Sequence, residues 1–183
     1  FNVSNAETKN YTYNQARGIA MDNSQNLYCH LWSDLKKLDK ISGKYVVIDK
    51  KDKDINYALF IKDDTLFSCN KMVDVFSISK QRLLRSFPLQ TNIPKQVGSD
   101  IWSVFYMGNG RLLCGLSNGI QLLDIRTGKP ITIKCRADNL EPKFVYQLFK
   151  TKDNKIIATC SNGLFEMDRD GCILKHYFKK ARD

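Results

Sequence analysis

Histidine is the side chain that most often acts as a general base near neutral pH, and this chain holds two, His30 and His176. A serine or cysteine nucleophile needs such a base within hydrogen-bond reach. No serine, cysteine or carboxylate is placed by the local sequence to act with either histidine. We therefore expect no catalytic residue and no enzymatic activity in this chain.

Metal-binding signatures are weak. The stretch from Asp168 to Gly171 begins like a calcium loop, but the later oxygen ligands and the closing glutamate of such a loop are missing. The six cysteines show no Cys-x-x-Cys spacing of the kind that binds zinc. We expect neither a metal site nor a cofactor, and we interpret the aspartates of this stretch as turn residues.

Residues suited to ligand binding are better represented. Three aromatic residues lie at or just inside the start of an apolar run, with two basic residues nearby. The five candidate ligand-binding residues are Arg17, Tyr57, Trp102, Lys143 and Tyr146. Aromatic rings stack on sugar rings, while guanidinium and ammonium groups pair with carboxylate or sulfate. The alternative interpretation is that the rings only pack between structural repeats.

An internal repeat must position these residues. Its clearest copies run from Met107 to Asp124 and from Thr151 to Asp168, and they match almost position for position. Four copies are anchored on the apolar residue that follows a short polar turn: Leu27, Leu66, Leu112 and Ile156. The separations are 39, 46 and 44 residues, near the spacing of about 40–50 residues that is typical of four-stranded propeller blades.

Each copy contains four short runs rich in β-branched and aromatic residues, separated by turn residues. Ser-Asn-Gly joins the second and third runs at 117–119 and at 161–163. Asn-Gly between apolar runs predicts a hairpin with a type I′ turn. No segment shows a sustained helical stripe. We predict an all-β fold of four four-stranded antiparallel meanders, arranged as β-propeller blades.

The predicted organisation is one blade each for residues 16–54, 55–99, 100–142 and 143–183. Residues 1–15 look like the last strand and exit loop of an earlier blade, or a linker, so we expect an arc of a larger propeller or a processed chain. An open arc leaves an apolar blade face at each end, larger than the patches that soluble monomers usually expose. We therefore expect the isolated chain to self-associate through its end blades.

The repeat also indicates which cysteines can form disulfide bonds. Cys29 and Cys114 occupy the same position in different blades, and two further cysteines lie near that position. Equivalent positions in different blades are usually too far apart for a disulfide bond. We expect mostly free thiols that pack as small buried apolar residues. Cys135 and Cys172 fall on fourth strands, where a bond between them is not expected.

The chain carries a net charge of +10, from 29 basic and 19 acidic residues. A positive surface favours acidic glycans, nucleic acid or anionic membranes, although a solvated lysine-rich surface has the same composition. No nucleic-acid-binding signature accompanies the charge, so we expect no nucleic acid partner. No run of about 20 apolar residues, as a transmembrane helix requires, is present in the sequence.

The repeat unit resembles that of the two-component-regulator propellers. The segments that carry the resemblance are VFYMGNGRLLCGLSNGIQLLD and LFKTKDNKIIATCSNGLFEMD, and the match covers most of residues 16–183. The sequence departs from the family pattern in two ways. The first two hairpins lack glycine, and the tryptophan common in the second strand is replaced by Tyr28, Phe67, Leu113 and Ile157.

The resemblance implies the periplasmic sensor region of a membrane-anchored hybrid histidine kinase, as in Bacteroides-type two-component systems. On this hypothesis the chain senses an oligosaccharide, either acidic or neutral, and ligand binding shifts the population of propeller arrangements. Other blades or domains of the parent protein would be its partners. Two alternatives stay open: a protein-interaction scaffold without a small ligand, and a glycan-cleaving enzyme, which needs two carboxylates about 5–10 Å apart.

Overall fold

The computed structural model describes residues 16–31, 34–49, 58–89, 100–133 and 141–178. These residues form sixteen strands and, within the described ranges, no helix. The strands are β1 (Ala16–Met21), β2 (Leu27–Leu31), β3 (Asp34–Leu38), β4 (Tyr45–Asp49), β5 (Ala58–Lys62), β6 (Thr65–Cys69), β7 (Met72–Ser77), β8 (Arg82–Pro88), β9 (Ile101–Gly108), β10 (Arg111–Leu116), β11 (Gly119–Asp124), β12 (Lys129–Ile131), β13 (Val145–Lys150), β14 (Ile156–Cys160), β15 (Gly163–Met167) and β16 (Ile173–Tyr177). A helix suited to crossing a membrane is accordingly not found in the described part of the chain.

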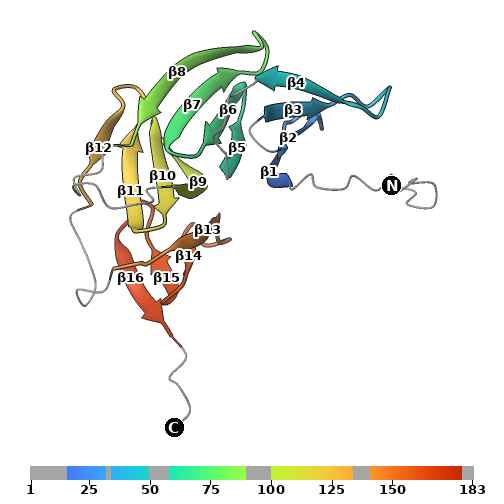
Figure 1. Cartoon of the computed structure of the whole chain (residues 1–183). Helices are drawn as coiled ribbons and strands as arrows, with labels where there is room; N and C mark the ends of the chain where they lie inside the picture. The colour runs from blue at the N-terminus through green and yellow to red at the C-terminus, as the bar shows by residue number, and fades with distance from the viewer. Residues whose placement is uncertain (1–15, 32–33, 50–57, 90–99, 134–140, 179–183) are drawn as a thin grey trace, which may run out of the picture.

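The strands form four four-stranded antiparallel sheets, and every sheet keeps its strands in chain order. We call β1–β4, β5–β8, β9–β12 and β13–β16 blades 1 to 4. Figure 1 shows the blades following one another around an arc, with the first strand of each blade on the inner side and the fourth on the outer side. The predicted all-β fold of four meanders is confirmed. The residue limits of the blades stay a prediction, because the segments between blades lie largely outside the described residues.

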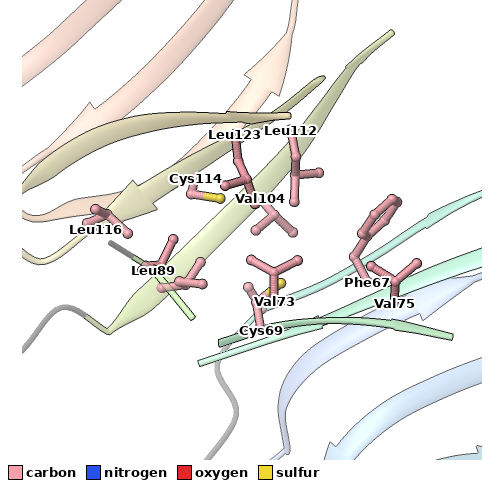
Figure 2. Packing of buried hydrophobic residues seen from close by; sticks show 12 residues of the cluster. Phe67, Cys69, Val73, Val75, Leu89, Val104, Leu112, Cys114, Leu116 and Leu123 are labelled. Atoms are coloured by element: carbon pink, nitrogen blue, oxygen red, sulfur yellow. The ribbon is translucent and has the colours of Figure 1, made fainter. Parts of the chain in front are cut away.

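The core lies between the blades. Leu112 and Cys114 of β10 pack in the layer between blades 2 and 3, whereas Leu113 packs in the layer between blades 3 and 4. Figure 2 shows the first of these layers, where side chains of β6 and β7 meet those of blade 3. A strand that is buried on both faces needs a nearly continuous apolar sequence. This requirement explains why the second run of each repeat is so apolar.

The hairpins between second and third strands form where predicted, but not with the predicted turn. Two residues connect β10 to β11 and β14 to β15. A type I′ turn needs φ > 0 at both of them, and neither Asn118 nor Asn162 lies in that region. The glycines that follow, Gly119 and Gly163, instead have φ of 141° and 124°. The type I′ prediction is therefore wrong here. Consecutive positive φ values occur in the β9–β10 hairpin, at 109–110.

The cysteines largely follow the prediction. Cys29, Cys69 and Cys114 are buried and form no disulfide bond, and burial raises the pKa of Cys114 to about 12. Cys172 is the exception, because it is disulfide-bonded. The expectation of no bond at this position is wrong. The argument from equivalent positions concerns second strands and does not extend to Cys172, which precedes a fourth strand at the outer edge of its blade.

The two ends of the arc each present a blade face that no described blade covers. On blade 1, Ile19 and Met21 are 64% and 62% exposed. On blade 4, Phe149 and Leu164 are exposed. These apolar side chains are the surface through which the self-association predicted above would occur.

The free face of blade 4 also carries a charged network. Glu166 of β15 stands where blades 2 and 3 place Val75 and Leu122. Its carboxylate lies 2.6 Å from Lys155 Nζ and accepts a hydrogen bond from the Tyr177 hydroxyl at 3.0 Å. These two contacts hold the pKa of Glu166 below its ordinary value of 4.5, and the contact with Lys155 has the larger effect.

This network predicts a pH-dependent stability. Because the folded-state pKa of Glu166 is lowered, its contribution is present above about pH 4.5 and is lost as the pH falls through the folded-state pKa. We expect Glu166→Gln to lower the urea midpoint near pH 7, and the difference from wild type to shrink toward about pH 2. Asp63→Asn, at an exposed position, is the matched control. A deficit of Glu166→Gln that is the same at both pH values would contradict the role of the carboxylate.

A glycine marks the close approach of blades 3 and 4. A Cβ atom on Gly115 of β10 would overlap Ser103 Oγ and lie 2.6 Å from Val145 Cγ1. We expect Gly115→Ala to lower the free energy of unfolding by about 1–3 kcal/mol, because overpacking forces these neighbours apart. Urea denaturation measures the change. Adding Ser103→Ala is expected to recover part of the loss through coupling of the two sites; strictly additive effects would count against the steric explanation.

Candidate binding site on blades 3 and 4

The inner strands of blades 3 and 4 bring three aromatic rings together. Trp102 lies in β9, Tyr146 in β13, and Phe144 directly before β13. The ring centroids of Trp102 and Phe144 are 5.0 Å apart, and those of Phe144 and Tyr146 are also 5.0 Å apart. Tilted rings at this spacing attract one another. Tyr146 is 52% exposed, so its ring is accessible to a ligand. We call Trp102, Phe144 and Tyr146 the aromatic cluster.

Three of the five predicted ligand-binding residues meet here. Trp102 and Tyr146 belong to the aromatic cluster, and Lys143 directly precedes Phe144. Arg17 lies on β1, where its side chain is not among the described parts of the chain, and Tyr57 lies outside the described residues. Ligand binding by these residues stays a prediction.

Phe144 is the residue of this site that the sequence prediction missed, and its backbone is unusual. Its φ of 47° lies in the left-handed region, which bulky residues rarely adopt. Two hydrogen bonds hold this conformation. Phe144 N donates to Ser117 O at 3.2 Å, and Ser161 N donates to Phe144 O at 3.2 Å. Strained backbone of this kind costs about 1–3 kcal/mol and is concentrated at functional sites.

The segment before β13 is tied to the β14–β15 hairpin. Asn162 Oδ1 accepts a hydrogen bond from Lys143 N at 2.9 Å, and Asn162 Nδ2 donates to Glu141 O at 2.9 Å. Ser161 Oγ donates to Lys143 O at 2.9 Å. The Ser-Asn pair of the repeat therefore does more than turn the chain. It fixes the position of the segment that carries Lys143 and Phe144.

Lys143 adds a positive charge to this surface. The residue is exposed, and among the described residues its ammonium group makes no ion pair. An ammonium group beside an accessible ring can pair with carboxylate, sulfate or phosphate while the ring stacks on an apolar or planar part of the same ligand. The arrangement is suited to recognition of an acidic ligand.

Both histidines are held by packing contacts. His30 is buried, and its Nε2 lies 2.9 Å from Ser68 Oγ of blade 2. The ring of His176 stacks on Phe165 with centroids 4.2 Å apart, and its Nε2 lies 2.7 Å from Asn162 O. The described ranges contain no group of three or more His, Cys, Asp or Glu side chains able to hold a metal ion.

The Asp168–Gly171 stretch forms a turn, as predicted. Asp168 Oδ1 accepts hydrogen bonds from Asp170 N at 2.8 Å and from Cys172 N at 2.9 Å, and Gly171 has a φ of 82°. The side chain of Asp170 pairs with Arg111 of blade 3 at 2.9 Å. These aspartates thus stabilise the turn and link two blades.

Comparisons with known proteins inform the fold. No protein-family model matches the chain, and no curated protein matches it. A chain in the "Crystal Structure of Mitotic Checkpoint Complex" is similar in structure, with a TM-score of 0.68 over 90% of the present chain. The chain is an arc of a β-propeller. The sequence identity is 12%, so the likeness concerns the fold alone, and the propeller arc spans about half (51%) of that chain.

The strained backbone at Phe144 yields a prediction about glycine. In an ordinary strand, glycine is less stable than alanine by about 0.5–1 kcal/mol. With φ at 47° the order should reverse, and we expect Phe144→Gly to be more stable than Phe144→Ala by about 1 kcal/mol in urea denaturation. Tyr146 of β13 is the matched control, where Tyr146→Ala is expected to be the more stable variant. The ordinary order at both positions would contradict the left-handed conformation.

Proposed function

We propose that this propeller arc is a non-catalytic binding module that docks an acidic segment of another protein on the aromatic cluster. One observation carries the proposal: a strained, hydrogen-bonded support presents the half-exposed ring of Tyr146 on a segment that also carries the exposed Lys143, directly before Phe144. Aromatic side chains are enriched in the cores of protein interfaces and among the residues that contribute most to binding.

The charge of the chain supports an acidic partner. With a net charge of +10, the chain attracts negatively charged segments, and complementary charge raises association rates and favours one class of partner over others. Binding should therefore weaken as salt is added, because ions screen charges at exposed surfaces.

The fold gives a second line of support. The similar solved chain belongs to a structure named for a complex, the Mitotic Checkpoint Complex. A propeller within an assembly is consistent with a protein-binding role for the present arc. This support is an analogy at the level of the fold, so the proposal rests chiefly on the site.

Tryptophan fluorescence provides a direct test. The chain has two tryptophans, so Trp32→Phe leaves Trp102 as the single reporter inside the aromatic cluster. We expect short Glu/Pro-rich peptides with one tyrosine to change this fluorescence saturably, and the same peptides with Gln in place of Glu to bind more weakly. Lys143→Met should reduce affinity about tenfold, since a charge-assisted contact contributes about 1.5–3 kcal/mol. Tyr146→Ala should also reduce affinity, because the stacking ring is lost.

Lys152→Met is the matched control for charge. Lys152 is exposed in the β13–β14 hairpin, at the other end of β13 from Lys143. We expect it to leave affinity unchanged. Equal weakening by the two lysine variants, or no saturable response to any acidic peptide, would contradict docking at the aromatic cluster.

A second function is favoured by the disulfide bond of Cys172, because disulfides persist in oxidising compartments such as the periplasm. In this proposal the arc belongs to the periplasmic, oligosaccharide-sensing region of a membrane-anchored two-component sensor kinase. An acidic oligosaccharide would stack on Tyr146 and pair with Lys143. Other blades or domains of the parent would then be its partners.

The same reporter separates the two functions. A response to oligogalacturonate that is absent with neutral cello-oligosaccharides and with acidic peptides would replace the protein-binding proposal by the sensing one. A reducing-end assay on the same samples tests the non-catalytic character, since cleavage of either sugar would create new reducing ends.

A further inference from the structure

The outer rim of each blade carries a turn with a left-handed residue. This turn joins the third and fourth strands of each blade. The left-handed residues, with their φ values, are Gly43 (66°), Gln81 (47°), Gly128 (72°) and Gly171 (82°). Glycine adopts this conformation without steric cost, and three blades use it. Blade 2, with Gln81, is the exception.

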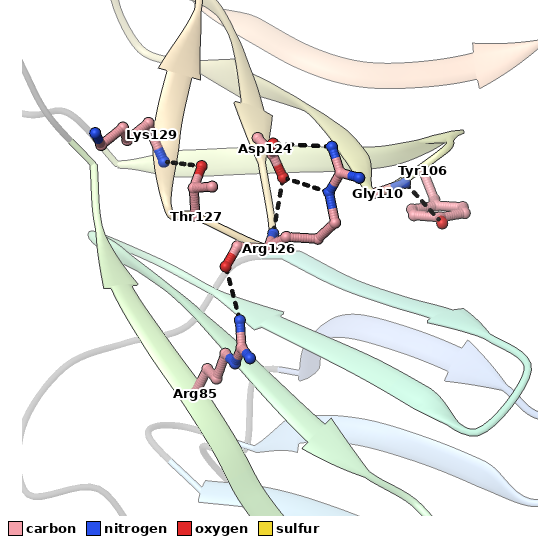
Figure 3. A network of polar contacts seen from close by, with 7 residues as sticks. All are labelled: Arg85, Tyr106, Gly110, Asp124, Arg126, Thr127 and Lys129. Carbon is pink, nitrogen blue, oxygen red and sulfur yellow. Dashed lines mark hydrogen bonds and ion pairs between the residues drawn. The ribbon is translucent and has the colours of Figure 1, made fainter.

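Between blades 2 and 3, the glycine allows close packing. A Cβ atom on Gly128 would overlap the ring of Phe87, which comes from β8. Beside it, Arg85 of β8 donates a hydrogen bond from Nη1 to Arg126 O at 2.7 Å, as Figure 3 shows. At the equivalent place between blades 3 and 4, a Cβ atom on Gly171 would lie 3.6 Å from a methyl group of Ile133, which is an ordinary van der Waals contact. Between blades 2 and 3, the glycine and the arginine of the outer strand together close the rim.

Between blades 1 and 2, the left-handed glycine and the outer-strand arginine are both replaced by other residues. Gln81 takes the place of the glycine. Val46 of β4, which pairs with Lys37 of β3, takes the place of Arg85 of β8. In blade 2, Arg85 pairs with Val75 of β7. Val46 has no donor for the turn of blade 2. Its side chain lines the space between the blades and is still 55% exposed. The rim consequently remains open around a cavity of about 540 Å³.

The cavity combines an apolar floor with positive charge. Leu35, Leu66 and Phe76 are buried side chains of its lining. Lys37 and Lys40 also line it and add two positive charges. Its volume lies within the range of about 300–1,000 Å³ that is usual for small-molecule sites.

The lining of the cavity carries more positive than negative charge. Lys37 Nζ lies 5.7 Å from the ring centroid of Tyr28, and Lys40 Nζ donates to a backbone carbonyl at 3.0 Å. Asp39 is the one carboxylate among the lining residues. It accepts hydrogen bonds within its own turn, including one from Ser42 Oγ at 2.6 Å, and these contacts lower its pKa. The lining therefore contains two lysines and a single carboxylate that is already engaged.

We propose that the cavity between blades 1 and 2 binds an aliphatic carboxylate, with its chain on the apolar floor and its carboxylate at Lys37 and Lys40. The apolar lining favours burial of methylene groups. The ammonium groups supply charge-assisted hydrogen bonds for the head group. This site is independent of the aromatic cluster, since it lies on other blades.

Calorimetric titration of the full chain tests the proposal with three probes of equal chain length. Sodium decanoate, below its micelle-forming concentration, should bind with saturation. 1-Decanol should bind about tenfold more weakly, and decyltrimethylammonium should not saturate. Lys37→Met should weaken decanoate binding about tenfold and leave decanol unchanged, because only the charge-assisted contact is lost. Lys80→Met, exposed next to Gln81 and outside the cavity lining, is the matched control.

A second variant tests the origin of the cavity. Val46→Arg with Gln81→Gly restores the pair of features found between blades 2 and 3, so it should close the rim, abolish decanoate binding and raise the thermal midpoint. If this double variant does not fold, the comparison of Lys37→Met with Lys80→Met decides alone. Absence of saturable decanoate binding, equal affinity for all three probes, or full binding by a folded double variant would overturn the proposal.

Discussion

Burial of each sheet against its neighbours is the constraint on which the rest of this structure depends. A four-stranded sheet has two apolar faces and cannot cover either by itself, so every internal blade is packed between two others. Leu112 and Leu113, adjacent in β10, lie in different layers of the core. Gly115 of the same strand sets how closely blade 4 approaches. The contact between β9 and β13 that brings Trp102 to Phe144 is a consequence of this packing.

The strands and their meander order were predictable because both depend on local information. Alternating and continuous apolar runs mark strands, and turn residues between them leave little choice of connection. The finer geometry was not predictable. Asn118 and Asn162 suggested a type I′ turn, yet the unusual φ values fall on the glycines that follow. At Cys172 the repeat gave no guidance, because a disulfide depends on which chain segments meet in space.

For the candidate site too, some residues could be predicted from the sequence and others could not. Trp102, Lys143 and Tyr146 could be singled out because the first strand of each blade starts at a recognisable place in the repeat. Phe144 could not, since nothing in its local sequence indicates a left-handed backbone. That conformation is maintained by partners from two different hairpins, Ser117 and Ser161. The cavity between blades 1 and 2 was also missed, and it reflects a departure from the repeat, with glutamine in place of glycine.

Among the described residues, every layer of the core joins blades that are neighbours in the sequence, and this arrangement matters while the protein is being made. The repeats are 39 to 46 residues apart, so a ribosome adding about 5–20 residues per second completes one in roughly 2–9 seconds. A newly emerged sheet can dock on the one made just before it, without waiting for a distant part of the chain. Until blade 4 is made, each freshly exposed apolar face is covered by the next segment to leave the exit tunnel, which shortens the time available for aggregation.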